Sequence, residues 1–256
     1  MSINLDSLKS RLSSLENSGK RSSVKDFTWK PEVGKTQIRI VPYQFNKENP
    51  FIEAYFHYNL GRRTYLSPQT YGEADPVVEF AEQLKSRGNK EDWQLGRRME
   101  PKMRVYVPVI VRGREHEGVK FWGFGKTVYQ ELLNYIVDPD YGDITDLRSG
   151  RDITVNYTAA TGPGTYPSTA LLIKPNQSPA TEDKSVADNI LNGQTDFYDV
   201  FQKTTYDELK TALESYLNQD EEDTEEDTTE IRSEAPQQTV TPKESIDAAF
   251  DDLFNE

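Results

Sequence analysis

The chain has no cysteine and only two histidines, His57 and His116. Disulfides and thiolate metal sites are therefore excluded, and lone imidazoles cannot complete the ligand set of a structural zinc site. We accordingly expect neither a metal nor another cofactor. No apolar run approaches the roughly 20 residues that span a bilayer, and the N-terminus lacks the apolar core of a signal peptide. The sequence thus predicts a soluble cytoplasmic protein without a membrane partner.

Catalytic groups are missing as well. The two histidines lie far apart in the sequence, and there is no glycine-rich loop of the kind that binds phosphates. The series Asp140, Asp143 and Asp146 is typical of a solvated turn rather than of a metal-binding loop. We therefore expect a binding protein with no catalytic residues, not an enzyme.

Charge is distributed unevenly along the chain. The formal net charge of −13 would normally argue against a nucleic-acid partner. Residues 219–256, however, hold 14 acidic and 2 basic side chains, which accounts for −12 of that total. Residues 1–126 hold 22 basic and 15 acidic side chains, a net charge of +7. A basic half that can contact phosphates is thus combined with an acidic tail.

Three regions follow from these patterns. Residues 1–18 form an amphipathic arm, with leucines at helical spacing and a basic segment made of Lys9, Ser10 and Arg11. The serine-rich stretch 18–25 suggests a hinge, so the arm either docks on its own core or reaches a neighbouring molecule. Residues 19–218 form the core. Residues 219–256 form a disordered acidic tail that is too poor in apolar side chains to fold alone.

The core combines short β-rich runs with a few helices. Strands are expected at residues 36–41, 51–58, 102–111, 119–124, 153–157 and 170–173. Asp75 and Pro76 occupy the N-cap and first position of a helix that reaches about Arg87. Further helices are expected at residues 127–137, 184–191 and 205–217. This pattern predicts an α+β fold with an oligonucleotide-binding β-barrel as its core.

Aromatic and cationic side chains alternate within the basic half. Unpaired bases stack on aromatic faces, at about 1–3 kcal/mol per base, while cations neutralise phosphates. We therefore expect a groove for single strands lined by Arg62, Arg63, Tyr65, Trp93, Arg97, Arg98, Lys102, Arg104, Tyr106, Lys120, Trp122, Phe124 and Lys126. Alternatively, the aromatic residues are core and the cations form a solvated face. In strand 119–124, Trp122 and Phe124 share one face and Phe121 takes the other, so one set should be at least partly exposed.

The end of the tail contains its few large apolar residues. Ile246, Phe250, Leu253 and Phe254 fall on one helical face among acidic residues. Such a segment typically folds when a partner offers a groove, so these residues are candidates for partner binding.

Lys120–Lys126 reads KFWGFGK, an aromatic segment that ends in Gly-Lys and enters a predicted helix. This segment most strongly, and several others in the same order, resemble the helix-destabilising single-stranded DNA-binding proteins of T-even bacteriophages. Residues 29–42 resemble the family's opening strand and residues 89–98 its basic connector. Residues 161–166 resemble its Gly/Tyr loop, which adds Tyr166 to the expected DNA contacts. With the basic arm and the acidic tail, the likeness covers essentially the full chain.

The resemblance implies cooperative, sequence-nonspecific binding of single-stranded DNA in replication, recombination and repair, within the host cytoplasm. It implies that Lys9, Ser10 and Arg11 contact the adjacent molecule on DNA, and that the tail recruits phage replication and recombination enzymes. An adaptor protein, whose tail is its main function and whose barrel is a scaffold, is the alternative. An adaptor would have negligible affinity for oligonucleotides.

Known family members hold zinc with one histidine and three cysteines in the region that matches residues 57–78. Here only the histidine is kept, and Ser67, Asp75 and Val78 stand where thiolates would be. We therefore expect a zinc-free version of this subdomain. Apolar packing should stabilise it, with Val77, Phe80, Ala81 and Leu84 as the buried face of its helix.

Overall fold

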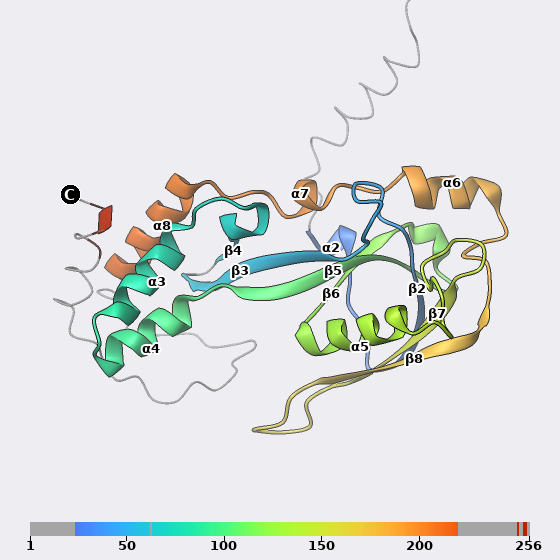
Figure 1. Ribbon diagram of the computed structural model, residues 1–256, viewed down its shortest axis with the longest axis horizontal. Helices are drawn as coiled ribbons and strands as arrows, with labels where there is room; N and C mark the ends of the chain where they lie inside the picture. Colours follow the sequence, from blue (N-terminus) through green and yellow to red (C-terminus); the bar gives the residue numbers. More distant parts are fainter. Residues whose placement is uncertain (1–23, 62, 220–249, 251–252, 255–256) are drawn as a thin grey trace, which may run out of the picture.

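A computed structural model describes residues 24–61, 63–219, 250 and 253–254. Its two long antiparallel strands, β3 (Ile52–Leu60) and β5 (Lys102–Val111), connect a helical end to a sheet-rich end (Figure 1). The other strands are β1 (Thr28–Trp29), β2 (Gly34–Ile40), β4 (Arg63–Leu66), β6 (Lys120–Phe124), β7 (Arg151–Thr158) and β8 (Ser168–Gln177). The α-helices are α2 (Val24–Phe27), α3 (Pro76–Ser86), α4 (Lys90–Met99), α5 (Lys126–Val137), α6 (Lys184–Asn192), α7 (Phe197–Val200) and α8 (Tyr206–Gln219). Short 3-10 helices are η1 (Pro68–Tyr71) and η2 (Glu115–Glu117).

The described strands form one sheet in the order β1-β6-β5-β2-β7-β8, with β3 paired to β5 and β4 paired to β3. Strand β5 is long enough to pair with β3 near its start, with β6 in its middle and with β2 near its end. The α+β class predicted from the sequence is confirmed. Because β1 and β8 lie at opposite ends of this order, the pairings among the described strands do not close a ring. The oligonucleotide-binding barrel therefore stays a prediction.

Each strand and helix predicted for the core corresponds to an observed element, with its ends displaced by a few residues. Asp75 caps α3 as predicted, because its side chain accepts the amides of Val77 and Val78 and Pro76 takes the first helical position. Helix α4 was not predicted, since its sequence was interpreted as a basic connector. It starts after Asn89, whose side chain accepts the amide of Asp92.

Both faces of β6, and of β5 where it pairs with β6, pack against other elements. On one face, Val107 and Trp122 belong to a cluster that α5 covers with Val128 and Leu132. On the other face, Phe56 and Phe121 belong to a cluster that α7 covers with Phe197 and Val200. The expectation that one side of β6 is exposed was therefore wrong. Phe121, Trp122 and Phe124 are all buried, because packed layers lie above and below this strand.

Helices α3, α4 and α8 form a second apolar unit at the helical end (Figure 1). The predicted buried face of α3, which consists of Val77, Phe80, Ala81 and Leu84, is confirmed. Helix α8 adds Leu209 and Leu213, and α4 adds Leu95 and Met99. Gly96 allows α3 and α4 to approach closely, since a Cβ at this position would lie 2.5 Å from the carbonyl oxygen of Ala81. None of the described helices is both long and apolar enough to cross a membrane.

Candidate nucleic-acid interface

One face of β3 and β5 presents tyrosines and cations together. Ala54 pairs with Arg104 and Phe56 pairs with Lys102, so the alternate residues Tyr58, Lys102, Arg104 and Tyr106 point to the same side of the sheet. Tyr58 is 41% exposed, Lys102 is exposed, and Arg104 and Tyr106 are half-buried. We call these four residues the sheet-face group. They combine the phenol rings and positive charges that single strands require.

Local packing fixes the orientation of this group. The Nη2 of Arg104 donates a hydrogen bond to the carbonyl oxygen of Gly123 at 3.1 Å, which draws the guanidinium across β6. Gly123 also makes room for Tyr106, because a Cβ at this glycine would lie 2.6 Å from the tyrosine ring. The same ring lies 4.8 Å from that of Phe201. Gly123 of the KFWGFGK segment therefore leaves the space that the ring of Tyr106 occupies.

The positive charge of Arg104 influences the pKa of both tyrosines in the sheet-face group. Burial raises the pKa of Tyr106 to about 12, with a further rise from Tyr58, while Arg104 acts in the opposite direction. Burial also raises the pKa of Tyr58, and Arg104 again opposes the rise. Both phenols therefore stay neutral at physiological pH. They therefore add no negative charge near the phosphates of a bound strand.

Helix α4 carries a second group of exposed cations beside an aromatic ring. The guanidinium of Arg97 lies 5.4 Å from the ring centroid of Trp93, which is 44% exposed, and Arg98 follows on the exposed side of the helix. We call Trp93, Arg97 and Arg98 the α4 group. Two residues, Glu100 and Pro101, separate the end of this helix from Lys102, the first residue of β5. Of those two, Glu100 forms an ion pair with Lys85 at 2.7 Å, which offsets its negative charge.

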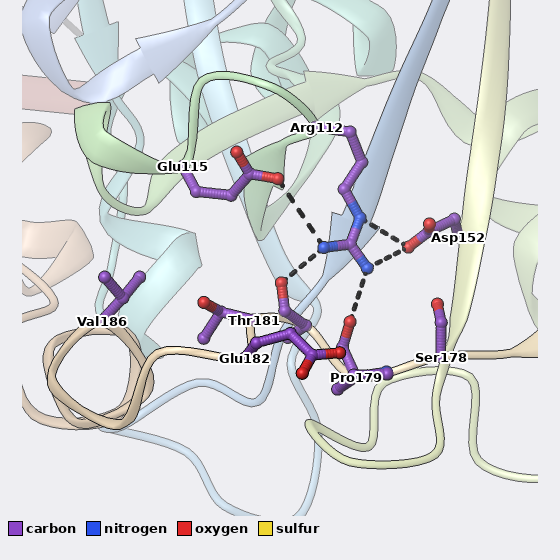
Figure 2. A pocket seen from close by; sticks show the side chains of 9 residues that line it. Arg112, Glu115, Asp152, Ser178, Pro179, Thr181, Glu182 and Val186 are labelled. Carbon is purple, nitrogen blue, oxygen red and sulfur yellow. Dashed lines mark hydrogen bonds and ion pairs between the residues drawn. The ribbon is translucent and has the colours of Figure 1, made fainter.

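Arg112 lines a pocket near the end of β5, and partners within the protein already occupy its guanidinium (Figure 2). The guanidinium of Arg112 donates to the carboxylate of Asp152 and to the carbonyls of Pro179 and Ala180, and it also lies 3.7 Å from Glu115. Arg39 donates to the same carboxylate. These contacts use the N–H groups of Arg112 and tie β5 and β7 to the segment that follows β8. This pocket is therefore a structural node rather than a phosphate site.

The remaining predicted DNA contacts do not join either group. Arg63 pairs with Leu60, and Tyr65 packs on the α3–α4–α8 unit, so both point to the face opposite the sheet-face group. Lys120 donates to the carbonyl oxygen of Asp26. Lys126 is exposed at the start of α5, and Tyr166 is 80% exposed in the loop between β7 and β8. Arg62, together with Lys9, Ser10, Arg11 and Ile246, lies outside the described residues.

Trp122 and Phe124, two of the predicted DNA contacts, lie in the core of the structure. Trp122 is 1% exposed and Phe124 is 4% exposed, and their rings pack against each other with centroids 4.6 Å apart. Trp122 also contacts Trp29 edge to face. Neither ring offers a face to a base in this structure, so the alternative of a core role holds for both.

Sequence reasoning missed Tyr58 and Lys203. Tyr58 is the last residue of a predicted strand, and its proximity to Arg104, which opposes the rise in its pKa, depends on the pairing of β3 with β5. The Nζ of Lys203 lies 4.7 Å from the ring centroid of Tyr71 and 4.8 Å from that of Tyr198. These two tyrosines pack against the same aromatic cluster as Tyr106. No local sequence pattern indicates this contact, because its members are far apart in the chain.

The region that matches the family's zinc site is closed by hydrogen bonds. The Nε2 of His57 lies 2.9 Å from Oδ2 of Asp75, and its Nδ1 lies 3.1 Å from the carbonyl oxygen of Met99. The hydroxyl of Ser67 donates to the same oxygen of Asp75 at 2.5 Å. Both imidazole nitrogens are therefore engaged, and no group of three or more acidic, histidine or cysteine side chains among the described residues could hold a metal. Zinc does not fit this site.

These features define an α+β nucleic-acid-binding protein, with cations and aromatic rings on a sheet and on a neighbouring helix. A family model described as gp32 DNA binding protein like matches residues 32–219. The chain therefore belongs to this family, whose members bind single-stranded DNA and are binding proteins rather than enzymes. A search of curated proteins finds no match to the chain.

Proposed function

We propose that this protein coats single-stranded DNA cooperatively and without sequence preference during phage DNA replication, recombination and repair in the host cytoplasm. The observation that carries the proposal is the sheet-face group, where Tyr58, Arg104 and Tyr106 lie on one side of β3 and β5 and interact electrostatically. Stacking and phosphate neutralisation need no base-specific hydrogen bonds, so this surface suits any sequence. The α4 group lies just before Lys102 in the chain and supplies a further contact for the strand.

The two ends of the chain have separate roles in this proposal. The arm of residues 1–18 contacts the adjacent molecule through Lys9, Ser10 and Arg11, which makes binding cooperative. The acidic tail competes with DNA for the basic surface, since it carries −12 of the net charge, and its terminal apolar residues recruit replication and recombination enzymes.

A titration of fluorescent poly-dT against salt tests the binding proposal. Neutralising each phosphate should contribute about −0.7 to the slope of log affinity against log salt. A matched duplex of the same length should bind more weakly, and an oligonucleotide too short for two molecules should lose the cooperative part. A flat salt response, or equal affinity for duplex and single strand, would contradict the proposal.

A further inference from the structure

The sequence contains a single Asn-Gly dipeptide, Asn192–Gly193, at the point where α6 ends. Asn192 is the last residue of the helix, Gly193 follows it, and both are exposed. The side-chain amide of an asparagine can be attacked by the backbone nitrogen of the next residue. Glycine favours this attack, because it has no Cβ to hinder the approach and its backbone is the least restricted. The dipeptide is therefore a candidate site for spontaneous deamidation.

The reaction needs no reagent other than water. Once the amide of Gly193 has lost its proton to solvent, its nitrogen attacks Cγ of Asn192, a C–N bond forms, and the side-chain nitrogen leaves as ammonia. Water then opens the resulting succinimide ring at either of its carbonyls. Opening at the side-chain carbonyl gives aspartate. Opening at the main-chain carbonyl gives isoaspartate, in which the main chain is longer by one methylene group.

The folded chain holds the attacking nitrogen away from this reaction. The amide of Gly193 donates a hydrogen bond to the carbonyl oxygen of Asn189 at 2.8 Å, as the last bond of α6. Asn192 itself has a helical backbone, which directs the next amide along the helix axis and not toward its own side chain. The last turn of α6 must therefore open before the ring can form.

The residue that follows the dipeptide keeps this turn closed. Gln194 is 8% exposed, and its Nε2 donates to the carbonyl oxygens of Pro42 and Ile190 at 2.7 and 2.8 Å. Its Oε1 accepts the amide of Gln44 at 3.0 Å. We call these three hydrogen bonds the Gln194 clamp. They connect α6 to the segment between β2 and β3, and opening the turn would leave buried polar groups without partners.

The Gln194 clamp lies just before α7 in the chain, on the same long side of the molecule (Figure 1). Asp196 caps α7, and its carboxylate accepts the hydroxyl of Tyr43 at 3.1 Å. That hydroxyl in turn accepts the amide of Phe197 at 2.9 Å. The ring of Phe197 lies 5.3 Å from that of Tyr106. A continuous set of contacts therefore connects the end of α6 to a tyrosine of the sheet-face group.

We propose that Asn192–Gly193 is a deamidation site whose rate is set by the Gln194 clamp, and that its products loosen α7 against Tyr106. Aspartate places a negative charge at the C-terminal end of α6, where the helix dipole is itself negative and the last turn has no basic residue. Isoaspartate lengthens the main chain, so Gln194 no longer faces Ile190. Both products weaken the clamp. The effect on DNA rests on the proposed function, whereas the modification itself does not.

Mass spectrometry on the full-length protein measures the modification. Trypsin releases residues 185–203 as one peptide, in which Asn189 is an internal control because a β-branched residue follows it. After incubation in mildly alkaline buffer, we expect aspartate and isoaspartate at Asn192, formed more slowly in the folded protein than in urea. Gln194→Ala should raise the rate in the folded protein on the order of tenfold, because it removes the clamp. Gln202→Ala, at an exposed glutamine between α7 and α8, should leave this rate unchanged.

Hydrogen exchange gives a second measure of the same opening. The factor by which folding slows deamidation should match the protection of the Gly193 amide, since one opening event exposes this nitrogen to both reactions. This comparison uses the wild type alone, so it remains decisive if circular dichroism shows that Gln194→Ala has lost its fold. Equal deamidation rates in the folded protein and in urea would overturn the role of the clamp. An intact Asn192 in the folded protein, at a time when the sample in urea is converted, would overturn the site.

Asn192→Gln isolates the effect of the products, because its longer side chain would have to close a larger, less favourable ring. After the same incubation, the amides of Phe197 and Tyr198 should exchange faster in the wild type than in this variant. The wild type should also lose affinity for oligo-dT in proportion to its converted fraction. Unchanged exchange in α7 after conversion contradicts the loosening. Failure of fresh wild type to bind oligo-dT contradicts the proposed function instead, and the exchange measurement still decides whether deamidation loosens α7.

Discussion

His57 and Asp75 form a buried pair, with Nε2 and Oδ2 2.9 Å apart, that links β3 to the N-cap of α3. The two residues are 2% and 3% exposed. Asp75 also accepts the hydroxyl of Ser67, and His57 reaches the carbonyl of Met99 at the end of α4. One carboxylate and one imidazole therefore join four segments of the chain. This is a cross-link of the kind that a metal supplies elsewhere in the family.

The first prediction concerns the strength of this cross-link. Asp75→Asn keeps an oxygen that can cap α3, but it removes the charge that pairs with His57. Breaking a buried pair typically costs about 3–5 kcal/mol, and we expect the free energy of unfolding in urea to fall by an amount in this range. Asp183→Asn is the matched control, since Asp183 caps α6 through the same kind of contacts at an exposed site. Equal losses in the two variants would mean that only the cap matters.

The second prediction is a pH dependence. Burial alone would raise the pKa of Asp75, but its hydrogen bonds and the charge of His57 more than offset this, and the pKa lies below its usual value. A carboxylate with a lowered folded pKa stabilises the protein fully above its unfolded pKa of about 3.9, and this stability is lost as the pH falls through the folded value. Wild type should therefore lose stability below about pH 4 more steeply than Asp75→Asn. Parallel pH profiles in denaturation experiments would refute this assignment.

The sequence predicted elements better than it predicted contacts. The period-2 runs and the Asp75-Pro76 cap are local signals, and each corresponds to an observed strand or helix. Whether a side chain is exposed to solvent, by contrast, is not determined by the residues next to it in the sequence. Whether Trp122 faces solvent depends on α5, and whether Phe121 does so depends on α7, which begins far along the chain. Tyr58 joined the candidate site for the same reason, because its proximity to Arg104 depends on the pairing of β3 with β5 and not on the sequence around it.

The third prediction separates an exposed tryptophan from a buried one. Trp93→Ala should weaken binding to oligo-dT by about 1–3 kcal/mol, the contribution of one stacked base, with little change in melting temperature. Trp122→Ala should instead destabilise the fold by about 3–5 kcal/mol, because its side chain is 1% exposed. Calorimetry and fluorescence anisotropy on both variants provide the comparison. Normal DNA affinity for a folded Trp93→Ala protein would remove the α4 group from the interface.

The fourth prediction concerns metal. Since His57 already uses both ring nitrogens, the purified protein should contain no stoichiometric zinc, and a chelator should leave its melting temperature unchanged. Elemental analysis and thermal unfolding with and without chelator measure the two quantities. One zinc per chain would show that the hydrogen-bonded network opens to accept a metal.

The fifth prediction distinguishes cations that bind phosphates from cations that hold the fold. Arg104 is half-buried and interacts electrostatically with Tyr58 and Tyr106, so Arg104→Ala should weaken binding to oligo-dT. It should also make the slope of log affinity against log salt shallower by about 0.7, the contribution of one phosphate. Arg112 is the matched control, because its N–H groups are taken by Asp152 and by the carbonyls of Pro179 and Ala180.

We expect the control variant, Arg112→Ala, to differ from Arg104→Ala in both stability and salt dependence. Arg112→Ala removes two hydrogen bonds to Asp152 and frees two carbonyls, so it should lower the free energy of unfolding while keeping the salt slope of the wild type. The two measurements thus assign each arginine independently. A shallower slope for Arg112→Ala at an intact fold would place the pocket of Figure 2 on the path of the DNA. An unchanged slope for Arg104→Ala would remove the sheet-face group from that path, because a cation that meets no phosphate releases no counterion when the strand binds.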